Sequence, residues 1–339
     1  MHGRLGRRQS LTALTILLAL CCSIAPVSAQ ELGEQRIATS MMTFLKIGVG
    51  ARAVAMGEAF TPVADDATTL FWNAAGLALL REKRVHFSHT EWPADIDYDN
   101  AMMTFPLPQW DMGVGIQVAS LRTVMDFTSE QEPLPHGRTF SYSDFLVGIG
   151  LAREFTDRFS FGFNLKYVRE DLGRDVGGSI IHSWAADVGT MFHLPYRNFR
   201  MTMAWSNMGP DYQPPGGFVS TPPGSDPVNV RYQGFSPASV FAFGASIEPF
   251  RNRYYSLLTT LQFDHPADTA ERLKVGGELW LGNILALRSG YNPRSDEMRF
   301  SAGFGIRGGF GQNILHIDYA YTDGNALGRI DRFSVEMEF

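Results

Sequence analysis

The chain has 339 residues, including 25 phenylalanines and 34 glycines, and a formal net charge of −6. The acidic balance argues against nucleic acid as a partner, because no basic stripe is available to neutralise phosphates. Aromatic residues make up 12% of the chain, yet the mean hydropathy is only −0.09. This pairing is typical of a transmembrane β-barrel, in which apolar and polar side chains alternate along each strand.

Residues 1–29 are predicted to be a secretory signal peptide that is cleaved on export. Three arginines precede the apolar run Leu11–Cys22, and Val27–Ala29 supplies small residues for the cleavage site. The run is shorter than the roughly 20 residues that a membrane-spanning helix needs. Both cysteines, Cys21 and Cys22, lie in this segment. The exported chain is therefore predicted to have no disulfide, no cysteine metal site and no thiol nucleophile.

Residues 30–82 are predicted to form a plug inside the barrel. Residues 39–80 do not alternate, and they favour two short helical pieces rich in small residues. Asp65 or Asp66 can cap a helix at its start, and Gly76 can end it. A barrel of fourteen strands is too wide for its own side chains to fill. Residues of the plug that are candidates to line a ligand route are Phe44, Arg52, Met56, Phe60, Asp65, Asp66, Phe71, Trp72, Asn73 and Gly76.

Residues 83–339 are predicted to form the barrel, because polar and apolar residues alternate there with a period of two. In one segment Phe159, Phe161 and Phe163 fall on one face, and Ser160 and Gly162 fall on the other. After Gln30 no apolar run is long enough for a transmembrane helix, so a membrane protein of this sequence must be a closed barrel. The predicted fold class is all-β, a transmembrane antiparallel β-barrel of about 14 strands. These strands are expected to begin near residues 84, 98, 110, 141, 158, 180, 197, 237, 253, 270, 283, 298, 312 and 329.

The connectors favour a barrel of the outer membrane. Those after even-numbered strands are predicted to be short, and the long ones follow odd-numbered strands, as in barrels whose short turns are periplasmic. The segment 209–235 carries six prolines and is predicted to be too rich in proline for a strand or helix. Its aromatic residues Tyr212, Phe218, Tyr232 and Phe235 are candidate partner contacts. The chain stops at Phe339, which resembles the terminal aromatic recognised in outer-membrane barrel assembly.

The plug segment also carries a family resemblance. The sequence from Gly50 to Phe60, the run Ala64–Ala67 and the sequence Trp72–Ala78 look like the N-terminal signature of the PorV/PorQ family, which is related to FadL-like long-chain fatty-acid transporters of the outer membrane. Glu58 departs from the pattern, where glycine is common, and so does Ala74, where proline is usual. The resemblance implies a fourteen-strand barrel with an N-terminal plug or hatch.

No catalytic or metal site is predicted, and no cofactor is expected. The eight histidines are scattered, without the spacing of a metal site. The most serious enzyme candidate is His86 with Ser88, two residues apart on one strand face. A serine–histidine pair needs an orienting group and an oxyanion hole, and neither can be placed from the sequence. The chain is therefore predicted not to be an enzyme.

Two functions follow from the resemblance, and the sequence does not choose between them. PorV-like members serve type IX secretion by receiving cargo proteins, which makes secreted cargo or secretion-system subunits the expected partners. FadL-like members instead admit hydrophobic small molecules or fatty acids, along a route expected near Phe44, Phe60, Phe71 and Trp72, with a lateral opening where strand pairing is disrupted. Both place the exported protein in the bacterial outer membrane, with membrane lipid around it and no nucleic acid.

Overall fold

A computed structural model describes residues 40–126, 128, 137–213, 217–220, 226–231, 233–295 and 298–339. The predicted signal peptide, the first ten residues of the predicted plug segment and Tyr232 lie outside the described residues. Of the helices within them, none is long and apolar enough to cross a membrane.

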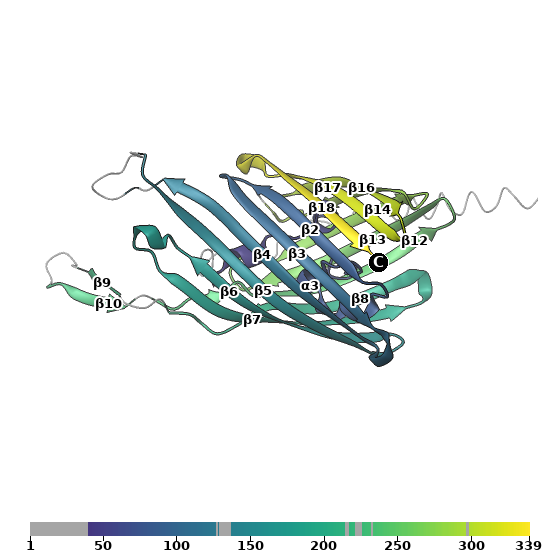
Figure 1. Ribbon diagram of the computed structural model, residues 1–339, viewed down its shortest axis with the longest axis horizontal. Coiled ribbons are helices and arrows are strands. Elements are labelled where there is room, and N and C mark those ends of the chain that lie inside the picture. Colours follow the sequence, from purple (N-terminus) through teal and green to yellow (C-terminus); the bar gives the residue numbers. More distant parts are fainter. Residues whose placement is uncertain are drawn as a thin grey trace, which may run out of the picture.

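Fourteen antiparallel strands close into a barrel, in which the last strand pairs with the first (Figure 1). The strands are β2 (Arg84–Trp92), β3 (Ile96–Leu107), β4 (Met112–Asp126), β5 (Thr139–Thr156), β6 (Phe159–Asp171), β7 (Ile180–Leu194), β8 (Phe199–Met208), β12 (Val240–Arg251), β13 (Tyr255–Pro266), β14 (Arg272–Leu281), β15 (Leu285–Tyr291), β16 (Phe300–Phe310), β17 (Asn313–Asp323) and β18 (Arg329–Glu338). The predicted fold class is confirmed, and every strand begins within three residues of its predicted start.

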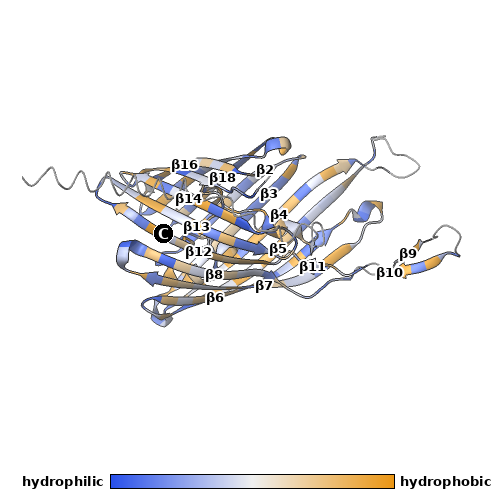
Figure 2. Cartoon of the chain, turned by 180° about the vertical axis from the view of Figure 1, so that it is seen from behind, coloured by the Kyte–Doolittle hydropathy of each residue, from blue (hydrophilic) through white to orange (hydrophobic). Residues whose placement is uncertain are grey.

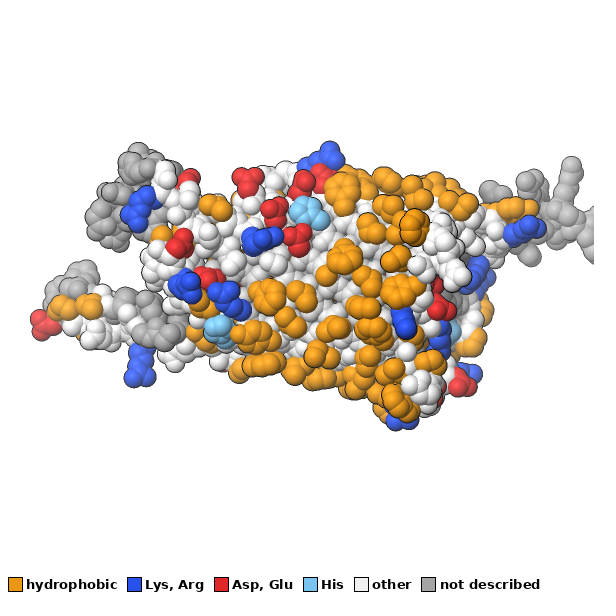
Figure 3. All heavy atoms as spheres, viewed as in Figure 1, with side chains coloured by type: hydrophobic (Ala, Val, Ile, Leu, Met, Phe, Trp, Pro, Cys, Tyr) orange, Lys and Arg blue, Asp and Glu red, His pale blue; other side chains and the backbone are white. Residues whose placement is uncertain are grey.

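The two faces of the wall differ as the alternation predicts. On β6 the side chains of Phe161, Phe163 and Leu165 are exposed, whereas Asn164 and Lys166, which alternate with them, are buried. Hydrophobic side chains accordingly cover much of the outer wall, and they alternate with polar positions along the strands (Figures 2 and 3). Several charged side chains on the strands face the lumen as well. Arg307 is partly buried, and the buried ones are Lys166, Asp187, Lys274, Glu278, Asp318 and Glu336.

The two ends of the barrel carry different connectors. At one end, here called the turn end, short turns follow β3, β5, β7, β12, β14 and β16, as predicted. Exposed aromatic side chains surround this end, namely Trp110, Phe155, Tyr196, Phe250, Tyr254 and Phe310. The opposite end, the loop end, carries the long connectors. In the described parts of the connectors lie four short 3-10 helices, namely η4 (Pro108–Trp110), η5 (Arg174–Val176), η6 (Tyr196–Asn198) and η7 (Asn325–Leu327).

The connector between β8 and β12 is more ordered than predicted. It contains a hairpin of β9 (Gly217–Ser220) and β10 (Val228–Arg231), which stands beyond the loop end (Figure 1). The prediction that proline excludes strands here was wrong, because none of the connector's six prolines falls within β9 or β10. Beyond the hairpin, β11 (Ser236–Pro237) pairs in parallel with β1 (Ser40–Met41), the first described strand.

The segment from β1 to Leu80 lies inside the barrel, where it forms the predicted helical plug. Its helices are η2 (Thr43–Lys46), α2 (Ala51–Ala55), α3 (Thr69–Trp72) and η3 (Ala74–Leu79). Glycines on the inner wall let the plug backbone approach closely. A Cβ added at Gly162 would overlap the backbone of η3, and one added at Gly290 would overlap Gly57.

The predicted helix boundaries within the plug were partly wrong. Asp66 does accept hydrogen bonds from the amide and hydroxyl of Thr68, just before α3. However, α3 ends at Trp72, because the side chain of Asn73 starts η3 by accepting from the Ala75 amide at 3.1 Å. Gly76 lies inside η3 instead of ending a helix, and a Cβ there would overlap the Ala64 carbonyl.

Candidate functional site

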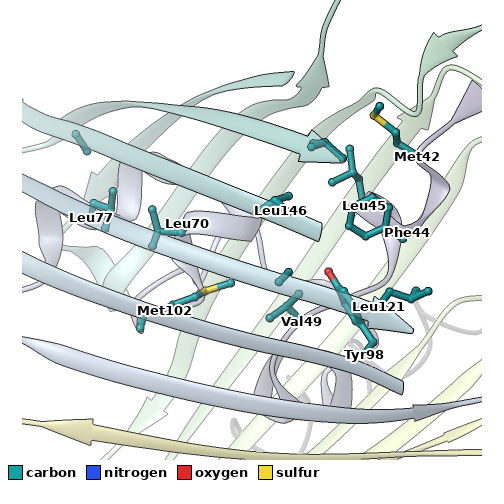
Figure 4. Close-up of a cluster of buried hydrophobic side chains, with 14 of the residues drawn as sticks. Met42, Phe44, Leu45, Val49, Leu70, Leu77, Tyr98, Met102, Leu121 and Leu146 are labelled. Atoms are coloured by element: carbon teal, nitrogen blue, oxygen red, sulfur yellow. The ribbon is translucent and has the colours of Figure 1, made fainter. Parts of the chain in front are cut away.

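The lumen has an apolar sector near the loop end. The plug contributes Met42, Phe44, Leu45 and Val49, and the inner wall contributes Tyr98, Met102, Leu121 and Leu146 (Figure 4). The rings of Phe44 and Tyr98 meet edge to face, with centroids 6.4 Å apart. Inward positions of a water-filled barrel are usually polar. This sector therefore differs from the lining of an aqueous pore.

A cavity of about 430 Å³ lies at the loop end, above the apolar sector. Phe44 and Ile47 of the plug line it, together with Trp92, Ile96 and Leu121 of the wall. The cavity also has charged lining residues, namely Lys46, Glu58, Asp144 and Arg272. We call it the loop-end cavity.

A smaller cavity of about 70 Å³, here called the inner cavity, lies between the plug and strands β6, β8, β12, β13 and β14. Phe71 and Trp72 line this inner cavity. Three residues, Lys46, Glu58 and Arg272, line both the inner and the loop-end cavities. These three charged side chains therefore stand at the junction between the two spaces.

Phe71 and Trp72 of the plug line the inner cavity, and Phe60 packs against Trp72; we call these three aromatic side chains the aromatic septum. The rings of Phe71 and Trp72 are 4.9 Å apart, and those of Trp72 and Phe60 are 6.2 Å apart. The indole N–H of Trp72 donates to the carbonyl of Val49 at 3.0 Å, which fixes the ring. Phe60 is fully buried, and the guanidinium of Arg52 lies 5.2 Å from its ring centroid.

A third cavity of about 360 Å³ lies on the other side of the septum, at the turn end. Its lining is strongly charged and includes Arg52, Asp65 and Asp66 from the plug. Because Arg52 also covers Phe60, the septum separates this turn-end cavity from the inner cavity. A polar solute can occupy the turn-end cavity, whereas the apolar sector lies on the opposite side of the plug.

Arg52 is the centre of the ion pairs between plug and wall. It donates to both carboxylate oxygens of Glu278 on β14, each at 2.8 Å. It also contacts Asp65 at 2.7 Å and Asp66 at 3.1 Å. The carboxylate of Asp65 in turn lies 3.2 Å from Arg200 of β8. Burial opposes ionisation of Asp65, but Arg52 and Arg200 outweigh it and lower the pKa of this carboxyl.

Two further ion pairs tie the plug to the wall nearer the loop end. Lys46 contacts Asp268 at 2.6 Å. Glu58 contacts Lys274 at 3.0 Å, and Lys274 also contacts Asp264 at 2.7 Å. The plug is therefore attached to the wall by charged groups at both ends of its path.

His86 and Ser88 lie on the inner face of β2, since both are buried while Phe87 is exposed. His86 lies 3.4 Å from Glu336, and no described atom makes a hydrogen bond to the Ser88 hydroxyl. The pair therefore lacks the serine–histidine hydrogen bond that a triad requires. Across the described residues, no group of three or more histidine, aspartate or glutamate side chains is arranged to hold a metal ion.

The other predicted site residues have different surroundings. Met56 and Asn73 pack against wall glycines, Gly276 and Gly189, and the Asn73 amide donates to the Thr190 carbonyl at 3.2 Å. In the connector, Tyr212 and Phe235 pair through their backbones, and the side chain of Tyr212 packs partly against the apolar cluster around the plug. The side chain of Phe218 lies outside the description.

Comparisons with known proteins agree with this architecture. The model of an uncharacterised protein family, UPF0164, matches residues 21–170. No curated protein matches the chain.

Several solved structures share the fold. The CymD monoaromatic hydrocarbon channel has a TM-score of 0.56 at 10% identity, covering 86% of this chain and 97% of that one. The toluene transporter TbuX of Ralstonia pickettii has a TM-score of 0.55 at 10% identity, with the same coverage. The toluene transporter TodX of Pseudomonas putida has a TM-score of 0.52 at 10% identity, covering 86% and 96%. The chain therefore has the fold of these channels, as expected for a FadL-like barrel, whereas the PorV/PorQ resemblance stays a prediction.

Sequence analysis did not identify the wall residues that meet the plug. Period-two alternation gives the face of a residue and not its partner. The sequence therefore did not reveal which charged wall residues meet the plug, among them Lys274, Glu278, Arg272 and Arg200. Glu58 was noted only as a departure from a pattern. Its contact with Lys274 joins positions 216 residues apart in the chain, so no local signal could reveal it.

Proposed function

We propose that this protein is an outer-membrane channel for hydrophobic small molecules, with residues 40–80 acting as a plug that must move. The observation that carries the proposal is the apolar sector between Phe44 and the inner wall. It lies directly below the loop-end cavity, on the side from which a ligand would enter. The fold shared with hydrocarbon channels supports the same function.

The route we propose runs from the loop-end cavity past the junction to the inner cavity, where the aromatic septum stops it. An apolar molecule is favoured along the first part, because it exchanges contact with water for contact with apolar side chains. The septum and the Arg52 ion pairs separate this part from the turn end. Passage to the turn end therefore needs displacement of the plug.

Dye entry into intact cells tests this function. We would measure the entry rate of the neutral dye phenylnaphthylamine, which fluoresces in apolar surroundings, and subtract the rate of matched cells without the protein. A several-fold faster rate is expected with the wild-type chain. If cells with and without the protein took up the dye at equal rates, although the protein is present at the surface, the proposal would be refuted.

A protein-secretion role is the second candidate, and the β9–β10 hairpin favours it. The hairpin stands beyond the barrel, and the side chains of Val219, Val228 and Val230 are exposed on it. Exposed apolar side chains on a projecting element are suited to contact with protein. Native mass spectrometry of the protein extracted from its own membrane distinguishes the two functions: co-purified cargo supports secretion, and a lone barrel supports transport.

A further inference from the structure

Glu58 has an unusual backbone conformation for its residue type. Its φ is 61°, in the left-handed region that favours glycine. A strained backbone at a residue with a polar side chain indicates that the side chain has a function. The residues around its carboxylate indicate that function.

The carboxylate lies at the junction between the loop-end and inner cavities, which Lys46 and Arg272 also line. It accepts a hydrogen bond from Lys274 at 3.0 Å. A Cβ added at Gly48 would lie 2.5 Å from the Oε1 atom of Glu58. The missing side chain at position 48 therefore leaves the room that this carboxylate occupies.

The wall around Glu58 is rich in cations. Arg332 is 1% exposed, and its guanidinium donates to the Thr322 hydroxyl at 3.1 Å and lies 5.3 Å from the Trp92 ring. Within the described ranges, neither Arg332 nor Arg272 has a carboxylate within 4.0 Å. Burial opposes ionisation of Glu58, but Lys274 and Arg332 outweigh it and lower the pKa of its carboxyl.

We propose that Glu58 is a specificity-determining residue that reserves the junction for uncharged ligands. The inference rests on the proposed transport function and names its substrate class. The wall cations would otherwise form a binding site for an anion, and Glu58 occupies it. A carboxylate tethered in the site has an effective concentration of about millimolar or more, so a free sulfonate or carboxylate competes poorly, whereas a neutral molecule has nothing to displace.

Two dyes of similar shape test the inference in intact cells. Phenylnaphthylamine is neutral, and anilinonaphthalenesulfonate carries one sulfonate. The measured quantity is the ratio of anionic to neutral dye entry, each corrected for cells without the protein. Glu58→Gln keeps the size of the side chain and removes its charge. We expect it to raise the ratio about tenfold, which corresponds to about 1.4 kcal/mol.

Gly48→Ala provides a second variant that keeps the charge of Glu58. The added methyl group would displace the end of the Glu58 side chain and meet Val54 Cγ2 at 3.1 Å, so this variant should raise the ratio in the same direction by a smaller factor. Glu154→Gln is the matched control for net charge, because Glu154 pairs with the exposed Arg81 at the turn end. Its ratio should equal that of the wild type.

The outcomes separate the two proposals. If the wild-type chain does not speed entry of the neutral dye, the transport function fails. If it does, but Glu58→Gln leaves the ratio unchanged, the role of Glu58 is overturned. An anionic dye that enters the wild type as fast as the neutral dye also overturns it. If Glu58→Gln does not reach the membrane, the ratio measured for Gly48→Ala decides.

Discussion

Arg52 illustrates how one side chain can hold the plug in place. It neutralises Glu278 of the wall and Asp65 and Asp66 of the plug, and it covers the ring of Phe60. Burial and the nearby carboxylate of Glu336 raise the pKa of Asp66. The acidic groups around Arg52 therefore need this cation to remain close together.

Replacing Arg52 should weaken the plugged state. In Arg52→Gln the three carboxylates lose their shared cation, and breaking a buried ion pair of this kind costs about 3 kcal/mol or more. We expect a loss of that size in the free energy of unfolding, measured by denaturant titration in detergent, and faster proteolysis of the plug.

Arg81→Gln is the control for the Arg52 prediction. Arg81 pairs with Glu154 at 3.0 Å, but its side chain is 62% exposed. Solvent screens such a pair, so its loss should change stability by no more than about 1 kcal/mol. Equal effects of the two substitutions would show that Arg52 does not hold the plug.

At the scale of elements, the plug and the strands fit because inner-wall glycines leave space for the plug backbone. Gly162 receives η3, Gly276 receives Met56 and Gly290 receives Gly57. The contact is between backbones, so a side chain at these positions has no flexible neighbour that can move aside.

Gly290→Ala is therefore expected to destabilise the plugged barrel. Overpacking of a core costs about 1–3 kcal/mol of stability. Because the backbone of Gly57 is rigid, we expect a loss near the upper end of that range. Stability in detergent and protease sensitivity of the plug measure the effect. Gly308→Ala on β16 should be neutral, because a Cβ there meets nothing within 4 Å; a comparable loss in that variant would argue against the packing account.

Some of these elements could be predicted from the sequence and others could not. The strands were predictable because alternation repeats along every one of them, and the plug was predictable because residues 39–80 break that rhythm. The β9–β10 hairpin was missed because prolines dominate its connector, although they lie outside the two strands. The end of α3 was missed because Asn73 can start a new helical turn as well as Gly76 can end one.

The candidate site was less predictable than the fold. Phe60, Phe71 and Trp72 were identified from the plug sequence, and they do meet, forming the septum. The wall side of the site depends on the register with which neighbouring strands pair. Arg332 and Thr322, for example, meet only because β17 pairs with β18, which composition and spacing do not reveal.

At the scale of the whole molecule, the loop-end and inner cavities lie on one side of the septum and the turn-end cavity lies on the other. The first two share the charged lining residues of the junction, and Arg52 lines the third. Transport through this arrangement requires the plug to leave its place, which is the central claim of our account.

A disulfide that fixes the plug tests this claim most directly. The amide of Ala51 donates to the Ser334 hydroxyl at 3.2 Å, which brings α2 and β18 within reach of a disulfide. Residues 30–339 contain no other cysteine. Cells carrying the double variant Ala51→Cys, Ser334→Cys would be assayed for neutral dye entry, oxidised and reduced, beside each single variant. Our account predicts that oxidation stops entry in the double variant alone and that reduction restores it. Undiminished entry with the plug linked to the wall would contradict it.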